Sequence, residues 1–201
     1  MPQSKLYQPL LLRLLHGVNA ILVIGAAITG FLVYDSWDGR FGKLGLTLKN
    51  RELIDIHGTF GFFFLPLMIL FTIYSIRAGS KRLLQPDSLN KLTQVGKPVW
   101  WVTLQRLANT LMLIAAIFSL ISGKFQDENW LPNGEMNHVW YDVHLIAWCG
   151  IIASLAIHIL MSIKVGGIPL ILSMFDPKFR PEDHPARWPE QIKAWLRRPH
   201  L

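Results

Sequence analysis

The chain has 201 residues, of which 51% are hydrophobic and only 16% are charged, and its formal net charge is +7. The apolar residues come in long blocks with most of the charges between them, a pattern that excludes an ordinary soluble domain. The single cysteine, Cys149, excludes an internal disulfide and a C-x-x-C-H site for covalent haem attachment. The basic balance follows from membrane charge asymmetry, so it does not indicate nucleic-acid binding.

Four apolar blocks are each long enough to cross the hydrocarbon layer, which takes about 20 residues. They cover residues 10–33, 53–76, 100–122 and 139–163. The first block is too long for a cleavable signal peptide, so it predicts a retained helix. The fold class predicted is all-α, an integral membrane bundle of four transmembrane helices within residues 1–165.

Residues 166–201 are predicted to form an interfacial segment and tail on the cytoplasmic side. The stretch Gly166–Phe175 is apolar but too short to span, so it is expected at the interface or packed under the bundle. Beyond it the tail is rich in proline, tryptophan and charge. The sequence leaves open whether this tail docks a partner or covers the cytoplasmic face.

Positive charge orients the bundle. Fifteen of the 20 lysines and arginines lie at the N-terminal end, between blocks two and three, or after block four. Because cytoplasmic segments of membrane proteins carry most of the positive charge, both termini and the middle link are predicted to be cytoplasmic. The two links on the opposite side carry five Lys/Arg against eight Asp/Glu.

Four of the seven histidines lie inside the predicted spans, namely His16, His57, His144 and His158. One intramembrane histidine is often only a hydrogen-bonding group between helices. These four, however, fall at two depths: His16 and His158 near the cytoplasmic face, and His57 and His144 near the opposite face. The sequence thus predicts two pairs.

His144 and His158 are 14 residues apart on the fourth helix. At about 100° per residue this spacing is within roughly 40° of four full turns, so both imidazoles point to nearly the same side, about 21 Å apart along the axis. Helix four therefore offers one imidazole to each pair, and helices one and two supply the partners.

Two imidazoles from facing helices can clamp the iron of a planar macrocycle in a bundle core. Zinc would need three or four ligands around one point, and neither depth offers such a set. The glycines near the histidines either let a flat ring approach the backbone or allow close helix packing. They are Gly17, Gly25, Gly30, Gly58 and Gly61.

Haem carboxylates would need donors near each membrane face. On the cytoplasmic side the candidates are Arg13 and Arg106, with Lys164 as a third, and on the other side Lys49 or Arg51. Each could instead be an ordinary headgroup anchor. Asn19 and Asn109 are polar residues within spans and are assigned to no role.

The motifs R-L-L-H (Arg13 to His16) and D-I-H-G (Asp55 to Gly58), with the pair His144 and His158, resemble the bacterial cytochrome b561-like superfamily. That group includes the b-type cytochrome subunits of nickel-iron hydrogenases and the gamma subunit of formate dehydrogenase. The resemblance implies two non-covalent haem b groups, one held by His16 and His158, the other by His57 and His144. It also implies electron exchange with a quinone near one membrane face.

The leading hypothesis is a membrane dihaem cytochrome that carries electrons between a redox partner and the quinone pool, with no catalytic residue of its own. A first alternative is a stand-alone quinone-linked oxidoreductase such as a superoxide oxidase. Superoxide would favour a positive approach surface, which only a local patch of Arg40, Lys43, Lys49 and Arg51 could supply. A second alternative is a haem-free transporter or scaffold in which the histidines relay protons or brace helices.

The expected partners are membrane lipid, a quinone, and a redox protein or a dehydrogenase or hydrogenase subunit. An extracytoplasmic redox protein could meet the acidic link between Lys124 and Asp142. A homo-oligomer is left open, and a nucleic acid is not expected. The expected location is the bacterial inner membrane.

Overall fold

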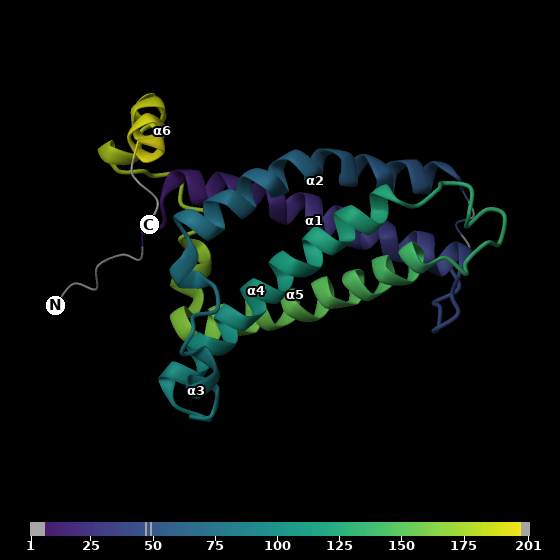
Figure 1. Ribbon diagram of the computed structural model, residues 1–201, viewed down its shortest axis with the longest axis horizontal. Coiled ribbons are helices and arrows are strands. Elements are labelled where there is room, and N and C mark those ends of the chain that lie inside the picture. Colours follow the sequence, from purple (N-terminus) through teal and green to yellow (C-terminus); the bar gives the residue numbers. More distant parts are fainter. Residues whose placement is uncertain (1–6, 47, 49, 198–201) are drawn as a thin grey trace.

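The computed structural model describes residues 7–197 except residues 47 and 49. Four long helices cross from one end to the other: α1 (Leu10–Trp37), α2 (Glu52–Arg77), α4 (Pro98–Lys124) and α5 (Val139–Leu172). All four are long and apolar enough to span a membrane. The described residues contain no strand, so the prediction of an all-α integral membrane bundle is confirmed (Figure 1).

Short elements join and follow the long helices. Between α2 and α4 lie a 3₁₀ turn, η1 (Ser80–Arg82), and the small helix α3 (Ser88–Leu92). After α5 come η2 (Pro181–Asp183), η3 (Pro185–Arg187) and α6 (Trp188–Leu196). The short elements gather at the end of the bundle where α1 begins (Figure 1).

The ends of the helices follow local chemistry. Pro98 occupies the first turn of α4, where its missing N–H costs no hydrogen bond. The last long helix breaks at Gly167, whose φ of 66° is left-handed, two residues before Pro169. Beyond this break the chain turns across the end of the bundle toward the start of α1 (Figure 1).

The helices pack as two hairpins, α1 with α2 and α4 with α5, and α2 also meets α4. A small core joins three of the helices, formed by Phe64, Met68 and Ala116 with partly buried neighbours from α1, α2 and α4. Many large apolar side chains, such as Ile21, Phe62 and Ile146, remain exposed on the bundle. In a hydrocarbon environment such exposure carries no penalty, so these residues face lipid.

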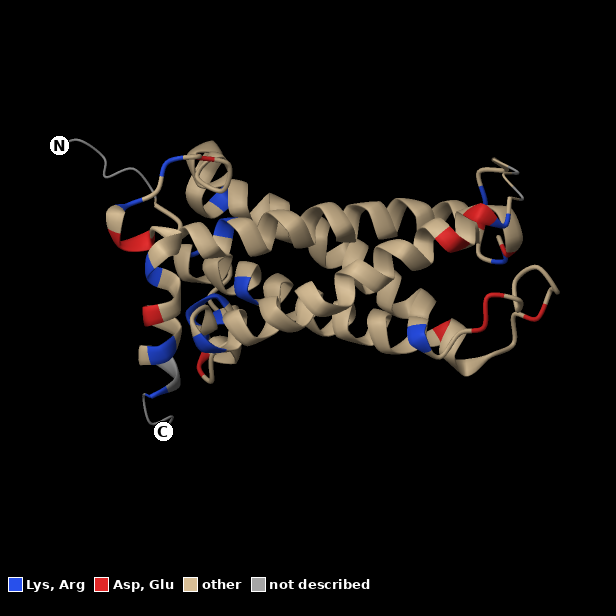
Figure 2. Ribbon diagram, turned by 90° about the horizontal axis from the view of Figure 1, so that it is seen from above, with Lys and Arg blue, Asp and Glu red and all other residues tan. Residues whose placement is uncertain are grey.

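Charge is divided between the two ends of the bundle (Figure 2). Lysines and arginines gather at the end where α1 begins, while acidic residues are prominent in the loops at the other end. We call the first the basic end and the second the acidic end. The long helices between the two ends, drawn tan in Figure 2, carry almost no charge there, as a region that spans hydrocarbon requires.

Candidate functional site

The first histidine pair lies toward the basic end of the bundle. His16 projects from α1 and His158 from α5, and the centroids of the two rings are 6.1 Å apart with 35° between their planes. Phe71 of α2 meets the His16 ring edge-on, with 6.4 Å between centroids. We call this pair the inner pair.

The second pair lies toward the acidic end. His57 of α2 faces His144 of α5, with 5.9 Å between ring centroids and nearly perpendicular planes at 86°. We call this pair the outer pair. The 14-residue spacing on α5 thus places one imidazole in each pair, and α1 and α2 supply one partner each.

The outer pair is oriented by hydrogen bonds to the ring nitrogens Nδ1. The His144 Nδ1 lies 3.0 Å from the carbonyl oxygen of Ser119, which can only accept, so this nitrogen carries the proton. The His57 Nδ1 lies 3.1 Å from the hydroxyl oxygen of Thr29. That hydroxyl gives its own proton to the Gly25 carbonyl, so it accepts from His57.

The inner pair has a side-chain partner in the same role. Asn109 of α4 places its Oδ1 2.7 Å from His158 Nδ1, and its amide Nδ2 donates to the carbonyl of Arg82 at 2.9 Å. Because the Arg82 carbonyl can only accept, the amide nitrogen must face it, and Oδ1 must face His158. His158 Nδ1 is therefore the donor.

Protonation at Nδ1 leaves Nε2 of His57, His144 and His158 with a free lone pair. A metal-ligating histidine typically donates its other ring N–H in this way. Thr29, Ser119 and Ser122 were not singled out from the sequence; Ser122 Oγ also lies 3.1 Å from His144 Nδ1. Hydroxyl residues are common in spans, and only the rotation of α1 and α4 decides which ones reach an imidazole.

Both pairs fit one iron between two imidazoles. A metal–imidazole bond is about 2 Å long, and the ring centre lies about 1 Å farther on, so two imidazoles sharing one metal have centroids about 6 Å apart. The centroid distances here are 6.1 and 5.9 Å. The described residues hold no group of three or more His, Cys, Asp or Glu that could ligate a metal ion, so the donor sets suit a planar macrocycle better than zinc.

Glycine makes room for the outer imidazoles. A Cβ added at Gly30 would lie 3.0 Å from His57 Cε1, and one at Gly123 would lie 3.2 Å from His144 Cε1. At Gly25 a Cβ would come within 2.3 Å of Phe60, so this glycine serves close helix packing. Added Cβ atoms at Gly17, Gly58 and Gly61 would meet no protein atom within 4 Å.

At the basic end, the residues considered as donors to haem carboxylates have different surroundings. Arg13 is only 6% exposed, and its Nη2 donates to the carbonyl of Lys178 in the tail at 2.8 Å. Arg106 interacts electrostatically with Asp87 in the link beside α3. Lys164 places its ammonium 5.0 Å from the Trp101 ring centre. The structure adds Arg82, which sequence reasoning missed and whose backbone carbonyl accepts from the Asn109 amide.

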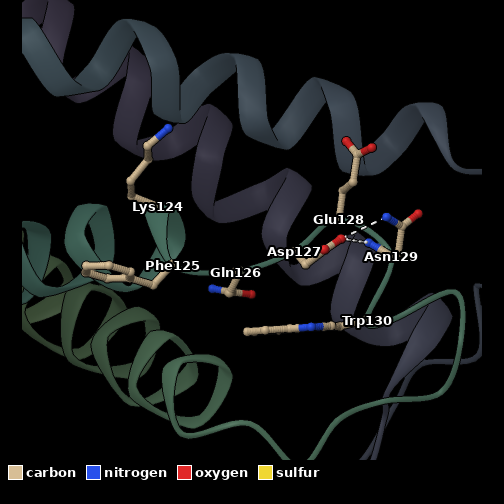
Figure 3. Close-up of a pocket in the computed structure, with 7 residues that line it drawn as sticks. All are labelled: Lys124, Phe125, Gln126, Asp127, Glu128, Asn129 and Trp130. Atoms are coloured by element: carbon tan, nitrogen blue, oxygen red, sulfur yellow. Dashed lines mark hydrogen bonds between the residues drawn. The ribbon is translucent and has the colours of Figure 1, made fainter.

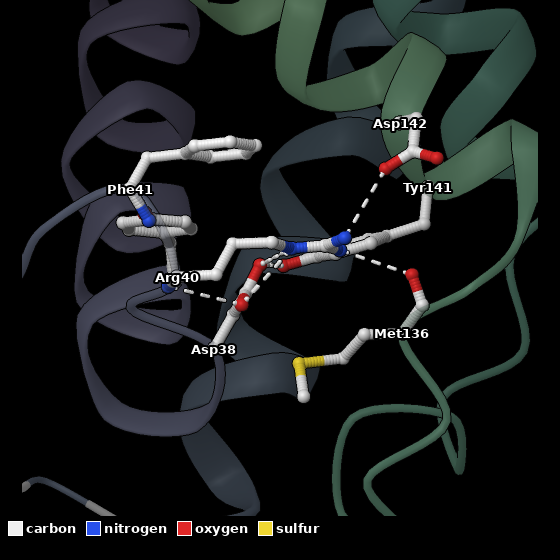
Figure 4. Close-up of polar contacts among 7 residues, drawn as sticks. Asp38, Arg40, Phe41, Met136, Tyr141 and Asp142 are labelled. Carbon is white, nitrogen blue, oxygen red and sulfur yellow. Dashed lines mark hydrogen bonds and ion pairs between the residues drawn. The ribbon is translucent and has the colours of Figure 1, made fainter.

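At the acidic end, Arg40 ties two loops together (Figure 4). Its guanidinium binds Asp38 at 2.9 Å, reaches Asp142 at 3.6 Å, and donates to the Met136 carbonyl at 3.0 Å. Tyr141 also donates to Asp38, at 2.8 Å. The hydrogen bond with Asp38 raises the pKa of the Arg40 guanidinium above its ordinary value.

Two of the four residues in the basic patch considered for superoxide form ion pairs. Arg40 is engaged by two carboxylates, and Arg51 pairs with Glu128 at 3.1 Å. Lys49 lies outside the described residues. The nearby loop from Lys124 to Trp130 lines a shallow depression whose residues include Asp127 and Glu128 (Figure 3). The positive charges of Arg40 and Arg51 at the acidic end are therefore offset by carboxylates.

Comparison with known proteins gives one family. The family model described as "Prokaryotic cytochrome b561" matches residues 7–177, which is most of the chain and includes all four long helices. No curated protein matches, and no solved structure matches. The matched range contains both histidine pairs and all the hydrogen-bonding residues around them.

Proposed function

Because this chain belongs to the prokaryotic cytochrome b561 family, and is thus a membrane b-type cytochrome of electron transfer, we propose that it holds two haem b groups and connects a redox partner with the quinone pool. His16 and His158 ligate one haem, and His57 and His144 ligate the other. The observation that carries the proposal is the pair of ring-centroid distances near 6 Å at two levels of one bundle.

When bound, each haem supplies a reversible one-electron change at its iron. The chain's own residues hold and tune it. Ser119 keeps the imidazole proton of His144 on Nδ1, Thr29 does so for His57, and Asn109 does so for His158. This leaves Nε2 of each ring for the metal and raises the basicity of the ligand. The apolar middle of the bundle excludes water from both positions and lowers the local dielectric.

Helix α5 contributes one histidine to each of the two positions. His144 and His158 are about 21 Å apart by helix rise, and the edges of two macrocycles held there would be nearer than the irons. Two haems at these positions would allow electron transfer from one side of the membrane to the other. At the inner end, the cofactor's carboxylates would meet Arg13, which has a buried Nε without a partner among the described residues, and Arg106.

Both termini are assigned to the cytoplasmic side of a bacterial inner membrane, with the outer pair near the opposite face. The asymmetry of Lys/Arg between the two ends supports this orientation (Figure 2). In this arrangement residues 1–165 form the membrane domain and residues 166–201 the cytoplasmic segment. A redox protein would approach the acidic loops, or a dehydrogenase or hydrogenase subunit would supply the electrons.

The orientation predicts the behaviour of fusions to the C-terminus. Green fluorescent protein joined there should fluoresce, and alkaline phosphatase should be inactive, because both would stay in the cytoplasm. The same reporters inserted in the loop at Asn133 should give the opposite result. An active phosphatase at the C-terminus would contradict the assignment.

Exchange with the quinone pool predicts that a lipid-soluble quinol reduces the protein. Purified protein in lipid nanodiscs is mixed with a reduced ubiquinone or menaquinone analogue in a stopped-flow spectrometer, and haem absorbance is followed. We expect the haem absorbance to change to that of the reduced protein after mixing with the quinol. A haem-loaded protein that dithionite reduces and neither quinol reduces would contradict the quinone role.

The two alternative functions gain no support. A superoxide oxidase would favour free positive charge near the outer pair, whereas Arg40 and Arg51 are paired with carboxylates. A haem-free transporter or scaffold conflicts with membership in a cytochrome family.

A further inference from the structure

Helix α1 carries a set of buried polar atoms that have no hydrogen-bond partner among the described residues. They are Arg13 Nε, Asn19 Oδ1, Ser36 Oγ and Trp37 Nε1. Leaving a buried polar atom without a hydrogen bond is unfavourable, so each of these atoms requires a partner. Two of these atoms lie near the inner pair, and the other two lie at the outer end of α1.

The outer two lie on the side of α1 that meets His57. Trp37 follows Gly30 by seven residues, and Ser36 follows Thr29 by seven. Seven residues are within about 20° of two full turns, so each pair shares a face of the helix, with a rise of about 10 Å. Gly30 and Thr29 both contact the His57 ring.

The direction of helical side chains brings these donors back toward the outer pair. Side chains on a helix lean toward its N-terminus. The N-terminus of α1 is at the opposite end of the bundle, so the indole of Trp37 extends from the outer end toward the level of His57. Ser36 is 7% exposed, which places its hydroxyl well inside the protein.

The two carboxylates beside Ser36 and Trp37 in the chain already accept hydrogen bonds from other groups. Asp35 accepts the backbone N–H groups of Leu44, Gly45 and Leu46. Asp38 accepts from Arg40 and from Tyr141. Neither carboxylate accepts from the indole N–H of Trp37 or the hydroxyl of Ser36, so these two donors need another acceptor.

The missing partner of Trp37 Nε1 and Ser36 Oγ must be a hydrogen-bond acceptor. An indole N–H can only donate, and the serine hydroxyl has a proton to give. We propose that Trp37 Nε1 and Ser36 Oγ donate hydrogen bonds to a carboxylate of the haem held by His57 and His144. This inference rests on the proposed function, and it names the carboxylate-bearing side chains of a porphyrin as the ligand group.

The assignment changes the chemistry expected at the outer end. The sequence offered Lys49 or Arg51 as candidates there, but Lys49 lies outside the described residues and Arg51 is an exposed partner of Glu128. A hydrogen bond to an ionised carboxylate is roughly twice as strong as one between neutral groups. Neutral donors thus anchor the outer haem without adding a buried charge.

The test follows haem release from the full-length protein in nanodiscs to excess apomyoglobin. The variants are Trp37→Phe and Ser36→Ala, and the control is Trp101→Phe at the basic end. The release phase that is missing from His57→Ala protein identifies the outer haem. In Trp37→Phe we expect this phase to be about 10- to 100-fold faster, with a smaller effect in Ser36→Ala and none in the control.

A second experiment, in which the protein is loaded with two different cofactors, distinguishes a hydrogen bond to the carboxylate from simple packing. Protein made without haem is loaded with haem or with haem dimethyl ester, in which the carboxylate charge is removed. The effect of Trp37→Phe should be large with haem and small with the ester, as in a double-mutant cycle. An equal effect with both would mean that Trp37 only packs, and would overturn the inference.

Two further outcomes are distinguishable. Two haems released at wild-type rates from Trp37→Phe and Ser36→Ala would overturn this inference and leave the proposed function standing. A wild-type protein that holds no haem at the His57 and His144 position would overturn both.

Discussion

Replacing Asn109 with leucine should weaken haem binding at the inner pair by about 10- to 100-fold, the usual cost of losing a residue that orients a metal ligand. The Asn109 Oδ1 is the acceptor for His158 Nδ1 at 2.7 Å, and the Arg82 carbonyl fixes the amide in that orientation. Leucine has the same branched shape, is somewhat larger, and carries no acceptor. The imidazole would lose both its fixed proton position and its fixed rotation.

The measurement is haem content after expression with limiting haem, together with a potentiometric titration of the haem that remains. Asn109→Asp provides a second, opposite perturbation at the same position. A carboxylate accepts the His158 proton more strongly than an amide, makes the ligand more basic and favours ferric iron. The midpoint potential of the inner haem should therefore fall in Asn109→Asp while that of the outer haem stays unchanged.

Thr29→Val is the matched control, because it removes the hydroxyl that His57 uses and leaves the inner pair intact. Its effect should appear at the outer haem alone. If Asn109→Leu and Asn109→Asp leave the content and potential of the inner haem at wild-type values, the role given to Asn109 is wrong.

The span positions were predictable because each membrane crossing imposes a length and a composition. The predicted blocks begin within two residues of α1, α2, α4 and α5. Their ends are less well predicted: α1 continues from residue 33 to Trp37, and α5 continues past residue 163 to Leu172 across the break at Gly167. Polar residues such as Asp35 lower the local hydropathy, but they remain helical where backbone N–H groups of the next loop bind them.

The pairing of the four histidines was predictable because depth and helix rotation both follow from residue spacing. The structure brings His16 to His158 and His57 to His144. The residues around them were not predictable in the same way. Whether Thr29 reaches an imidazole depends on the rotation of neighbouring helices, which no single helix sequence fixes.

Charged residues at the ends of the bundle were predicted least well. Arg82 comes from a link whose path depends on η1 and on its bonds to α4, through Asn109 and Thr110. The sequence placed Arg40 in a local basic patch, yet it is held by Asp38, two residues before it, and by Asp142 in the first turn of α5. Contacts between loops far apart in the chain leave no periodic signal in the sequence.

The central claim is that two pairs of histidines each hold one haem. The most direct test is a haem count by the pyridine method and a dithionite-reduced minus oxidised spectrum, on the wild-type protein and on four single His→Ala variants. Removing one histidine of a pair should empty or convert the position that this pair would hold and spare the other, because the pairs occupy different levels of the bundle.

The result we predict is two haems per chain in the wild type. His16→Ala and His158→Ala should lose the same low-spin component, and His57→Ala and His144→Ala should lose the other. Each histidine has its own matched control, since the two variants of one pair must agree and must differ from those of the other pair. One haem per chain in the wild type, or a loss pattern that joins His16 with His57, would contradict the account.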